Sequence, residues 1–308
     1  MLDKVLIIDE AHPVLLEKLS HLNVEYNPTI TIDELRLKLQ KVHILILRSK
    51  LSFTAEWIDL APNLKCIGRL GSGMDNIDVE YASTKGITYF NAPEGNRNAV
   101  AEQTLGMLLM LLSKSYKGAL EVKERVWDRK GNTGIELKYL TVGIIGYGNV
   151  GKQVAKRLSS FECKVVAYDR FLSNYGDAFA EQVSLQKLQS ISDIITLHVP
   201  LNETSFELVN RSFVDEVSRP FFLLNLARGK VVNSDAIKYG LETGKILGCG
   251  IDVFENEKLK TLTETQNQVF SYLINNERVI FTPHIGGLTQ NSFYKLSEVL
   301  ASKILAWL

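Results

Sequence analysis

The chain alternates short, continuous apolar runs with longer segments whose apolar residues recur at helical spacing. Early runs lie at residues 5–8, 42–47, 64–67 and 87–90, and later ones at 142–145, 165–168, 194–198, 221–225, 247–252 and 279–281. Short apolar runs separated by helical segments are typical of buried strands in parallel sheets that carry helices on both faces. The pattern therefore predicts an α/β protein with doubly wound parallel sheets.

Helical patterns are clearest in three segments. Thr31 and Glu34 have the spacing of a capping box, which predicts a helix that runs through Leu39. Residues 99–114 contain no proline and are apolar on most faces, so they predict a helix buried between domains or against another subunit. Residues 291–308 predict a last helix, whereas residues 118–138 form a polar stretch rich in charges.

The order of these elements predicts two domains, one of which interrupts the other. Residues 1–96 and 289–308 are expected to form the first domain, and residues 97–288 the second. Ligands of such folds bind at the carboxyl ends of the strands, so the cleft between the two domains is the expected reaction site.

The most informative motif opens the second domain. Residues 141–151 read TVGIIGYGNVG, in which Gly146, Gly148 and Gly151 have the G-x-G-x-x-G spacing between an apolar run and an amphipathic helix. Gly146 permits a tight turn, Gly148 allows the backbone to approach a pyrophosphate, and Gly151 allows close packing of helix and strand. The helix N-terminus offers free N–H groups to phosphates. The motif predicts a dinucleotide site.

The choice of dinucleotide depends on the end of the next apolar run. Asp169 lies there, where a carboxylate can accept hydrogen bonds from two ribose hydroxyls and would repel a 2′-phosphate. This favours NAD over NADP, although the neighbouring Arg170 is a residue type that can hold a 2′-phosphate.

The composition is that of an ordinary globular protein. The 308 residues are 45% hydrophobic and 23% charged, with 35 basic and 35 acidic side chains, so no basic footprint indicates nucleic-acid binding. Cys66, Cys163 and Cys249 lie apart in apolar stretches, as expected for reduced thiols in the cytoplasm. No signal peptide precedes the first apolar run, and the longest run, residues 105–112, is far below the ~20 residues of a membrane span.

Hydride transfer needs an acid/base, a cation and a group that tunes the base. Arg228 follows the run 221–225, and its planar fork can hold a carboxylate and polarise a carbonyl. His284 follows the run 279–281 beside two glycines, and imidazole titrates near neutral pH. A carboxylate on its far nitrogen would fix its tautomer. Both Glu255 and Glu257 follow Asp252, and the residues alone leave that choice open.

The remaining histidines and the absence of a metal cluster complete the candidate chemistry. His198 ends an apolar run and is a credible cleft residue, whereas His12 and His21 are expected at the surface. His43 lies within a strand pattern and is expected to be a satisfied core residue or an edge residue. No cysteine and histidine cluster has metal-ligand spacing, so no metal is expected.

In this order the motifs resemble the D-isomer-specific 2-hydroxyacid dehydrogenase family, most closely its D-3-phosphoglycerate dehydrogenases. The resemblance covers nearly the whole chain and rests on RLGSGMDNID (69–78), NAP (91–93), AVAEQTLGMLL (99–109), HVPLNET (198–204), NLARGKVV (225–232) and GIDVFENE (250–257). It implies a Rossmann nucleotide domain inserted into a flavodoxin-like substrate domain. It also implies a homodimer formed around residues 99–114.

The resemblance assigns roles to individual residues. His284 would be the acid/base, Glu257 its carboxylate partner, and Arg228 the group that binds and polarises the 2-oxo acid. Ser72 and Gly73 would hold the substrate carboxylate through their N–H groups. The cofactor contacts implied are Gly146, Gly148, Asn149, Val150, Gly151, Asp169, His198, Val199, Pro200, Leu226, Ala227, Asp252 and Gly286.

The sequence indicates the substrate less clearly than the family. Arg48 and Lys50 resemble the phosphate-holding stretch of D-3-phosphoglycerate dehydrogenases, which act in serine biosynthesis, but they also suit an ordinary charged loop. A glyoxylate or hydroxypyruvate reductase would need no phosphate clamp, and some relatives are NAD-sensing binding proteins instead of enzymes.

The chain departs from the family pattern at Leu226, at Lys230 and at Lys258, after which residues 258–278 have no predicted path. Since the chain stops at Leu308, no C-terminal regulatory domain is expected.

Overall fold

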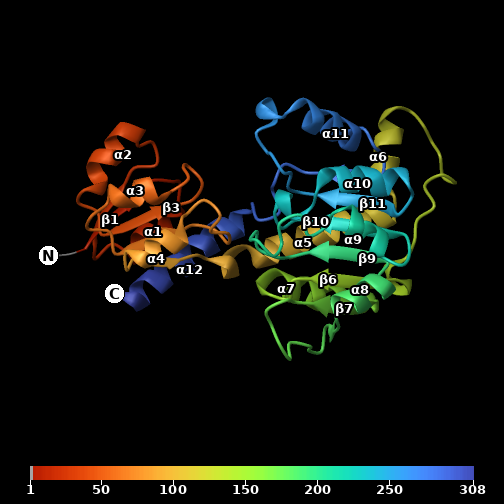
Figure 1. The fold of residues 1–308 in the computed structure, drawn as a ribbon, viewed down its shortest axis with the longest axis horizontal. Coiled ribbons are helices and arrows are strands. Elements are labelled where there is room, and N and C mark those ends of the chain that lie inside the picture. Colours follow the sequence, from red (N-terminus) through yellow and green to blue (C-terminus); the bar gives the residue numbers. More distant parts are fainter. Residues whose placement is uncertain (1–2) are drawn as a thin grey trace. The chain divides into compact units, whose positions relative to one another are not determined.

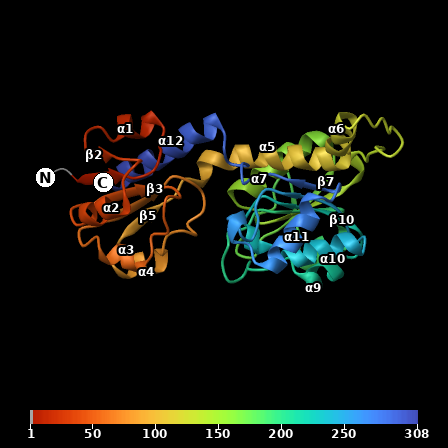
Figure 2. The same cartoon turned by 90° about the horizontal axis from the view of Figure 1, so that it is seen from above.

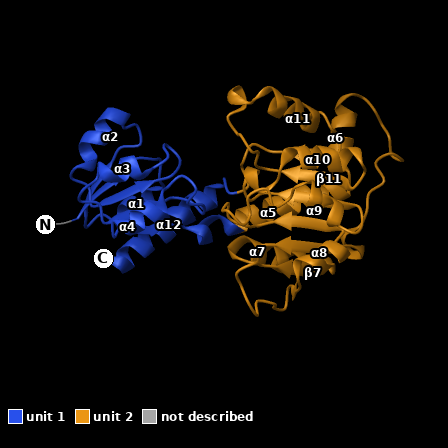
Figure 3. Cartoon of the chain, in the orientation of Figure 1, with its two compact units in different colours: residues 1–97, 287–308 blue, residues 98–286 orange. Residues whose placement is uncertain are grey.

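The computed structural model describes residues 3–308, which divide into two compact units (Figure 3). Of the described residues, unit 1 comprises 3–97 and 287–308, and unit 2 comprises 98–286. The chain passes from one unit to the other at 97/98 and 286/287, where the sequence pattern placed the crossovers at 96/97 and 288/289.

Unit 1 is a five-stranded parallel sheet with the order β2-β1-β3-β4-β5 (Figure 1). The strands are β1 (Lys4–Ile7), β2 (Asn23–Tyr26), β3 (Ile44–Leu47), β4 (Cys66–Arg69) and β5 (Thr88–Phe90). This 2-1-3-4-5 order is that of flavodoxin-like sheets, as the sequence predicts.

Helices cover both faces of this sheet and give unit 1 two apolar cores. On one face lie α2 (Ile32–Leu39), α3 (Ala55–Asp59) and α4 (Val79–Thr84), and on the other α1 (Pro13–Lys18) and the last helix, α12 (Gln290–Trp307). The predicted capping box of α2 is present, with Thr31 and Glu34 each accepting from the other's backbone N–H.

Unit 2 is a seven-stranded parallel sheet with the order β12-β11-β10-β9-β6-β7-β8. The strands are β6 (Thr141–Ile145), β7 (Lys164–Tyr168), β8 (Glu181–Gln182), β9 (Ile194–Leu197), β10 (Phe221–Asn225), β11 (Ile246–Ile251) and β12 (Val279–Phe281). The order reverses between β6 and β9, which is the switch point of a Rossmann sheet where ligands bind. Both predicted sheet types are therefore confirmed.

The helices of unit 2 also form two layers (Figure 2). One layer contains α5 (Pro93–Leu112) from residue 98 onward and α7 (Asn149–Leu158), and the other contains α8 (Leu185–Ile191), α9 (Arg211–Glu216), α10 (Ser234–Glu242) and α11 (Glu264–Ile274). The central strands β6, β9 and β10 are buried on both faces, which is why they are almost uniformly apolar. None of the described helices in residues 3–308 is long and apolar enough to span a bilayer.

Several expectations need correction. The strands β2 and β8 lie at sheet edges and carry polar residues, so they lack the apolar signal of a central strand. The polar stretch 118–138 begins within a helix, α6 (Ser115–Lys123), which has no buried residue. His12 is half-buried, where it caps α1 and contacts the rings of Phe293 and Tyr294.

Residues 258–278, which had no predicted path, contain α11. A capping box between Thr263 and Gln266 begins this helix, and Val269 and Leu273 are its buried residues. Phe270 on α11 lies against Phe254 and Phe281, with ring centroids 5.2 and 5.5 Å away. The polar insertion is therefore packed onto the loop that carries Glu257.

Candidate functional site: a dinucleotide turn and a histidine–glutamate pair

The Gly-rich turn joins β6 to α7, and two of its glycines are required by close backbone contacts. Gly146 has a φ of +95°, and a Cβ there would lie 2.5 Å from the carbonyl oxygen of His198. At Gly151 a Cβ would lie 2.1 Å from the carbonyl oxygen of Gly146. Any side chain at either position would push the helix and the strand ends apart.

Gly148 is different, because it faces open space. No heavy atom outside its immediate neighbours lies within 4 Å of a Cβ built there, and Gly148 is the N-cap of α7 without a side-chain capping bond. Gly148 therefore has no side chain that could accept from the first N–H groups of α7, which begins at Asn149 and Val150. This open backbone at a helix N-terminus fits the phosphates of a dinucleotide.

Asp169 follows β7 beside this turn, and its carboxylate is held by three backbone N–H groups. Oδ2 accepts from Tyr147 at 2.8 Å, and Oδ1 accepts from Phe171 at 2.9 Å and from Leu172 at 3.1 Å. The first of these bonds joins the carboxylate directly to the Gly-rich turn. Since an ionised carboxylate can accept about four hydrogen bonds, two on each oxygen, Oδ2 keeps one lone-pair direction for a ribose hydroxyl.

The other candidate cofactor residues follow neighbouring strands of the same sheet. His198, Val199 and Pro200 come directly after β9, and Leu226 and Ala227 come after β10. Burial lowers the pKa of His198 from 6.5 to about 3, so its ring is neutral, with Nε2 3.0 Å from the hydroxyl of Thr196 and a buried, unpartnered Nδ1. His198 is thus a hydrogen-bonding group and not a base at neutral pH.

Arg228 is positioned by the end of β10. Asn225, the last residue of the strand, accepts from the N–H of Ala227 at 3.1 Å and donates to the carbonyl of Arg228 at 2.9 Å. The guanidinium donates to the carbonyl of Ala227 at 2.7 Å. Asn225 is buried and closes the turn through both its amide atoms, a positioning role that the sequence analysis did not assign.

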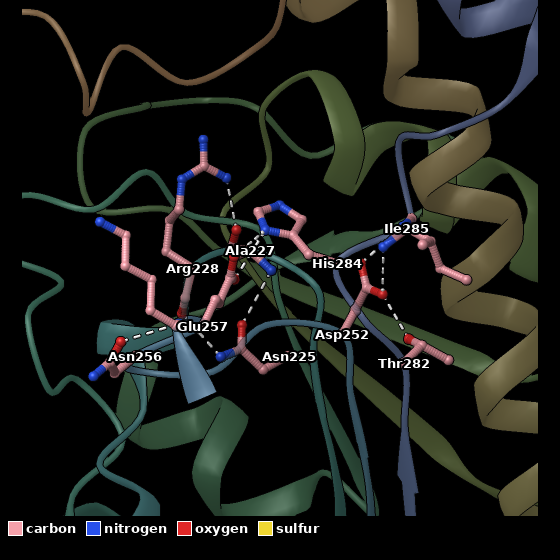
Figure 4. A network of polar contacts seen from close by, with 11 residues as sticks. Asn225, Ala227, Arg228, Asp252, Asn256, Glu257, Thr282, His284 and Ile285 are labelled. Atoms are coloured by element: carbon pink, nitrogen blue, oxygen red, sulfur yellow. Dashed lines mark hydrogen bonds and ion pairs between the residues drawn. The ribbon is translucent and has the colours of Figure 1, made fainter. Parts of the chain in front are cut away.

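His284 and Glu257 form the central pair. Nδ1 of His284 lies 2.9 Å from Oε1 and 3.0 Å from Oε2 of Glu257, and both side chains are 47% exposed. The side chains of Arg228 and His284 both lie beside the carboxylate of Glu257 (Figure 4). Glu255, the other carboxylate that the sequence left open, instead accepts from the N–H of Ser234 at the start of α10, at 2.5 Å.

The backbone of His284 is unusual, because its φ is +54°. Asp252, which is 2% exposed at the end of β11, holds the surrounding loop in this conformation. Its carboxylate accepts from the hydroxyl of Thr282 at 2.5 Å and from the N–H groups of Ile285 and Gly286 at 2.9 and 2.8 Å (Figure 4). A buried carboxylate with three donors fixes the direction in which the imidazole is presented.

The pH dependence of stability should reveal the interaction between His284 and Glu257. The hydrogen bond from His284 lowers the pKa of Glu257 below its ordinary 4.5, against the opposing effect of partial burial, and the charge of Arg228 adds to the decrease. A depressed carboxyl pKa stabilises the fold fully above pH 4.5, and this contribution is lost as the pH falls through the lower folded-state value. We therefore expect the thermal midpoint of the wild type to exceed that of Glu257→Gln near neutral pH, with the difference shrinking in acid. A difference independent of pH would contradict the ionised pair.

The candidate substrate residues lie in unit 1, after two adjacent strands. Arg48 and Lys50 follow β3, and Ser72 and Gly73 follow β4. Asn76 joins the two loops by donating to the carbonyls of Arg48 and Leu51, at 3.1 Å in each case. The structure thus brings these four residues to one sheet edge.

The two cations of this edge have different surroundings. Asp9, which lies two residues beyond β1, accepts from the N–H of Arg48 at 2.7 Å and fixes the loop. The ammonium of Lys50 donates to the carbonyl of Pro28. Arg48 lines a narrow hollow together with Glu10, Leu70, Phe293, Leu296 and Ser297, and this hollow has no room for a water molecule. A small ligand that contacts Arg48 would therefore lie outside it.

Known proteins are similar to this chain in sequence and in fold. Residues 105–286 match the family described as D-isomer specific 2-hydroxyacid dehydrogenase, NAD binding domain. The chain superposes on a D-lactate dehydrogenase of Aquifex aeolicus, complexed with NAD and lactic acid, with a TM-score of 0.86 and 28% identity, covering 99% of this chain and 95% of the other.

Curated relatives agree with this assignment. The chain is 35% identical to the hydroxypyruvate reductase of Thermotoga maritima, over 88% of this chain and 87% of that protein. It is 33% identical to the D-3-phosphoglycerate dehydrogenase of Methanocaldococcus jannaschii, over 98% of this chain but only 56% of that protein. The chain thus spans about half the length of its phosphoglycerate dehydrogenase relatives. It belongs to the D-isomer specific 2-hydroxyacid dehydrogenase family, whose members are NAD-dependent oxidoreductases.

Proposed function

We propose that this chain transfers a hydride between a D-2-hydroxy acid and NAD, with His284, Glu257 and Arg228 as its catalytic residues. The observation that carries the proposal is the pairing of His284 with Glu257 at 2.9 Å, beside Arg228, on the loops that follow β10, β11 and β12. These loops lie at the carboxyl edge of the same sheet whose switch point carries the Gly-rich turn.

In this proposal each of the three groups has its own task. Because Glu257 holds Nδ1 of His284, proton exchange with the substrate falls to Nε2. In oxidation Nε2 takes the hydroxyl proton while the hydrogen on C2 leaves as hydride, and in reduction Nε2 returns the proton to the new alkoxide. Glu257 stabilises the imidazolium that forms, and Arg228 stabilises the negative charge on the C2 oxygen. When bound, NAD supplies the hydride acceptor.

The leading substrate pair is 3-phosphoglycerate and 3-phosphohydroxypyruvate, which would give the protein a role in serine biosynthesis. The support comes from Arg48 and Lys50 beside Ser72 and Gly73, and from relatives of that activity that are 33–34% identical over at least 92% of this chain. The alternative is a glyoxylate or hydroxypyruvate reductase, which the Thermotoga relative supports to a similar degree.

Turnover of two oxo acids separates these alternatives. With NADH, a phosphoglycerate dehydrogenase should reduce 3-phosphohydroxypyruvate with a higher kcat/KM than hydroxypyruvate. Arg48→Gln should raise KM for the phosphorylated acid at least about tenfold, since one charge-assisted hydrogen bond is lost, and should leave KM for hydroxypyruvate unchanged. Equal effects on both acids would contradict the phosphate clamp. If a panel of 2-oxo acids gave no NADH oxidation at all, the alternative of an NAD-sensing binding protein would be favoured instead.

We also propose a homodimer, with α5 and α6 at or near the interface. Leu109 on α5 and Leu120 and Val122 on α6 are exposed apolar residues, and Trp127 just beyond α6 is 79% exposed. Exposed apolar residues clustered in one region indicate a contact surface. Sedimentation equilibrium should give twice the chain mass of 34.6 kDa. The expected compartment is the cytoplasm, in keeping with the three free cysteines, of which Cys66 and Cys249 are buried.

A further inference from the structure

The main chain of Asp169, like its carboxylate, is held in place. Its N–H donates to the hydroxyl of Tyr175 at 2.7 Å, and that hydroxyl donates to the carbonyl of Ala167 at 3.1 Å. Tyr175 is only 8% exposed, and its own N–H donates to Gln182 at 3.1 Å. One buried phenol therefore closes the segment after β7 back onto the strand and fixes the point from which the Asp169 side chain extends.

A second buried phenol joins the same segment to the Gly-rich turn. Tyr147, the residue between Gly146 and Gly148, is fully buried, and its hydroxyl donates to Oδ1 of Asp177 at 2.8 Å. The same oxygen accepts from the N–H groups of Phe179 at 2.8 Å and Ala180 at 3.3 Å. The rings of Tyr147 and Tyr175 lie against each other with centroids 5.6 Å apart.

We propose that Tyr175, Tyr147 and Asp177 are positioning residues that make this enzyme selective for NAD over NADP. The inference rests on the proposed contact between Asp169 and the adenosine ribose. A mobile carboxylate could turn away from a 2′-phosphate and leave the exposed Arg170 to bind it. Here the carboxylate has three backbone donors and its main chain is held by Tyr175, so the negative charge stays where a 2′-phosphate would meet it.

The two tyrosines should contribute unequally to the selectivity for NAD over NADP. Tyr175→Phe leaves the N–H of Asp169 without its hydroxyl acceptor. Tyr147→Phe removes one donor from Asp177, which keeps the N–H groups of Phe179 and Ala180. The larger loss of selectivity is therefore expected from Tyr175→Phe, and both variants keep the ring that packs in the core.

The test is equilibrium binding of NADH and NADPH to the full chain, measured by fluorescence titration in the absence of substrate. The wild type should bind NADH more tightly than NADPH. Tyr175→Phe should reduce the ratio of the two dissociation constants about tenfold, the effect of one hydrogen bond, and Tyr147→Phe should reduce it less. The matched control is Tyr139→Phe, which removes a hydroxyl from a side chain that is 76% exposed and should leave the ratio unchanged.

A double-mutant cycle with Asp169→Ala distinguishes positioning from a general structural role. Asp169→Ala alone should lower the selectivity, and adding Tyr175→Phe should lower it no further, because the tyrosine acts through the carboxylate. Equal weakening of NADH and NADPH by Tyr175→Phe, or a further loss of selectivity in the Asp169→Ala background, would overturn the inference. If Tyr175→Phe fails to fold, the ratio of the NADH and NADPH dissociation constants of Tyr147→Phe tests the inference in its place. A wild type that binds no NADH would contradict the proposed function itself, whereas unchanged selectivity in both tyrosine variants would contradict this inference alone.

Discussion

Replacing His284 by alanine should reduce kcat for 2-oxo acid reduction by about 10³-fold and leave the dissociation constant of NADH nearly unchanged. The expected loss follows from removing a positioned acid/base, which contributes roughly 10²–10⁴-fold to the rate. NADH affinity should persist because the Gly-rich turn and Asp169 are held by contacts that do not involve His284. Steady-state kinetics and a binding titration on the same preparation separate the two effects.

Two further variants sharpen this test. Glu257→Gln keeps the shape of the side chain but removes the negative charge beside Nδ1. Its kcat should therefore lie between the values of the wild type and of His284→Ala. His21→Ala changes an exposed histidine of unit 1 and should retain wild-type kinetics. If His284→Ala turned over normally, or if it lost NADH binding together with activity, His284 would not be the acid/base.

Arg228→Gln should cost about 3 kcal/mol or more of transition-state stabilisation, which corresponds to a decrease in kcat/KM of at least about 150-fold. The reason is that the charge on the C2 oxygen grows as hydride transfer proceeds, and a fixed cation at that oxygen stabilises the transition state more than the ground state. Arg228→Lys should recover only part of the loss, because an ammonium lacks the planar fork that can hold a carboxylate and polarise the oxo group together.

The control for this substitution is Arg129→Gln, at an exposed position of the same unit, which should keep the wild-type kcat/KM. The decrease in kcat/KM of Arg228→Gln should come from a lower kcat as well as from a higher KM, since the interaction strengthens in the transition state. A rise in KM with unchanged kcat would mean that Arg228 only binds the substrate, and full activity would exclude it from the site.

Much of the fold could be predicted because the central strands are continuous apolar runs. The strands β10 and β12 lie where the pattern places them, and a capping box correctly begins α2. The misses have a common cause, since edge strands and helices without a buried face carry little apolar signal. The edge strand β8 and the helix α6 are of this kind.

The candidate site was predictable where a strand end places a side chain at the carboxyl edge. Arg228 and His284 were proposed as site residues on this basis. The choice between Glu255 and Glu257 could not be made from spacing, because it depends on the loop path, which turns one carboxylate to the start of α10 and the other to the imidazole. The supporting contacts of Asp252, Asn225 and Tyr175 also could not be predicted from the sequence, since each residue acts through partners that the tertiary fold brings close.

A crystal structure of the protein with NAD and an unreactive 2-oxo acid analogue would test the account most directly. The proposed reaction predicts that Nε2 of His284 and the guanidinium of Arg228 both lie within hydrogen-bond distance of the oxygen on C2 of the analogue, with Glu257 still on Nδ1. An imidazole directed away from that oxygen, with no guanidinium beside it, would contradict the assignment of these residues to catalysis.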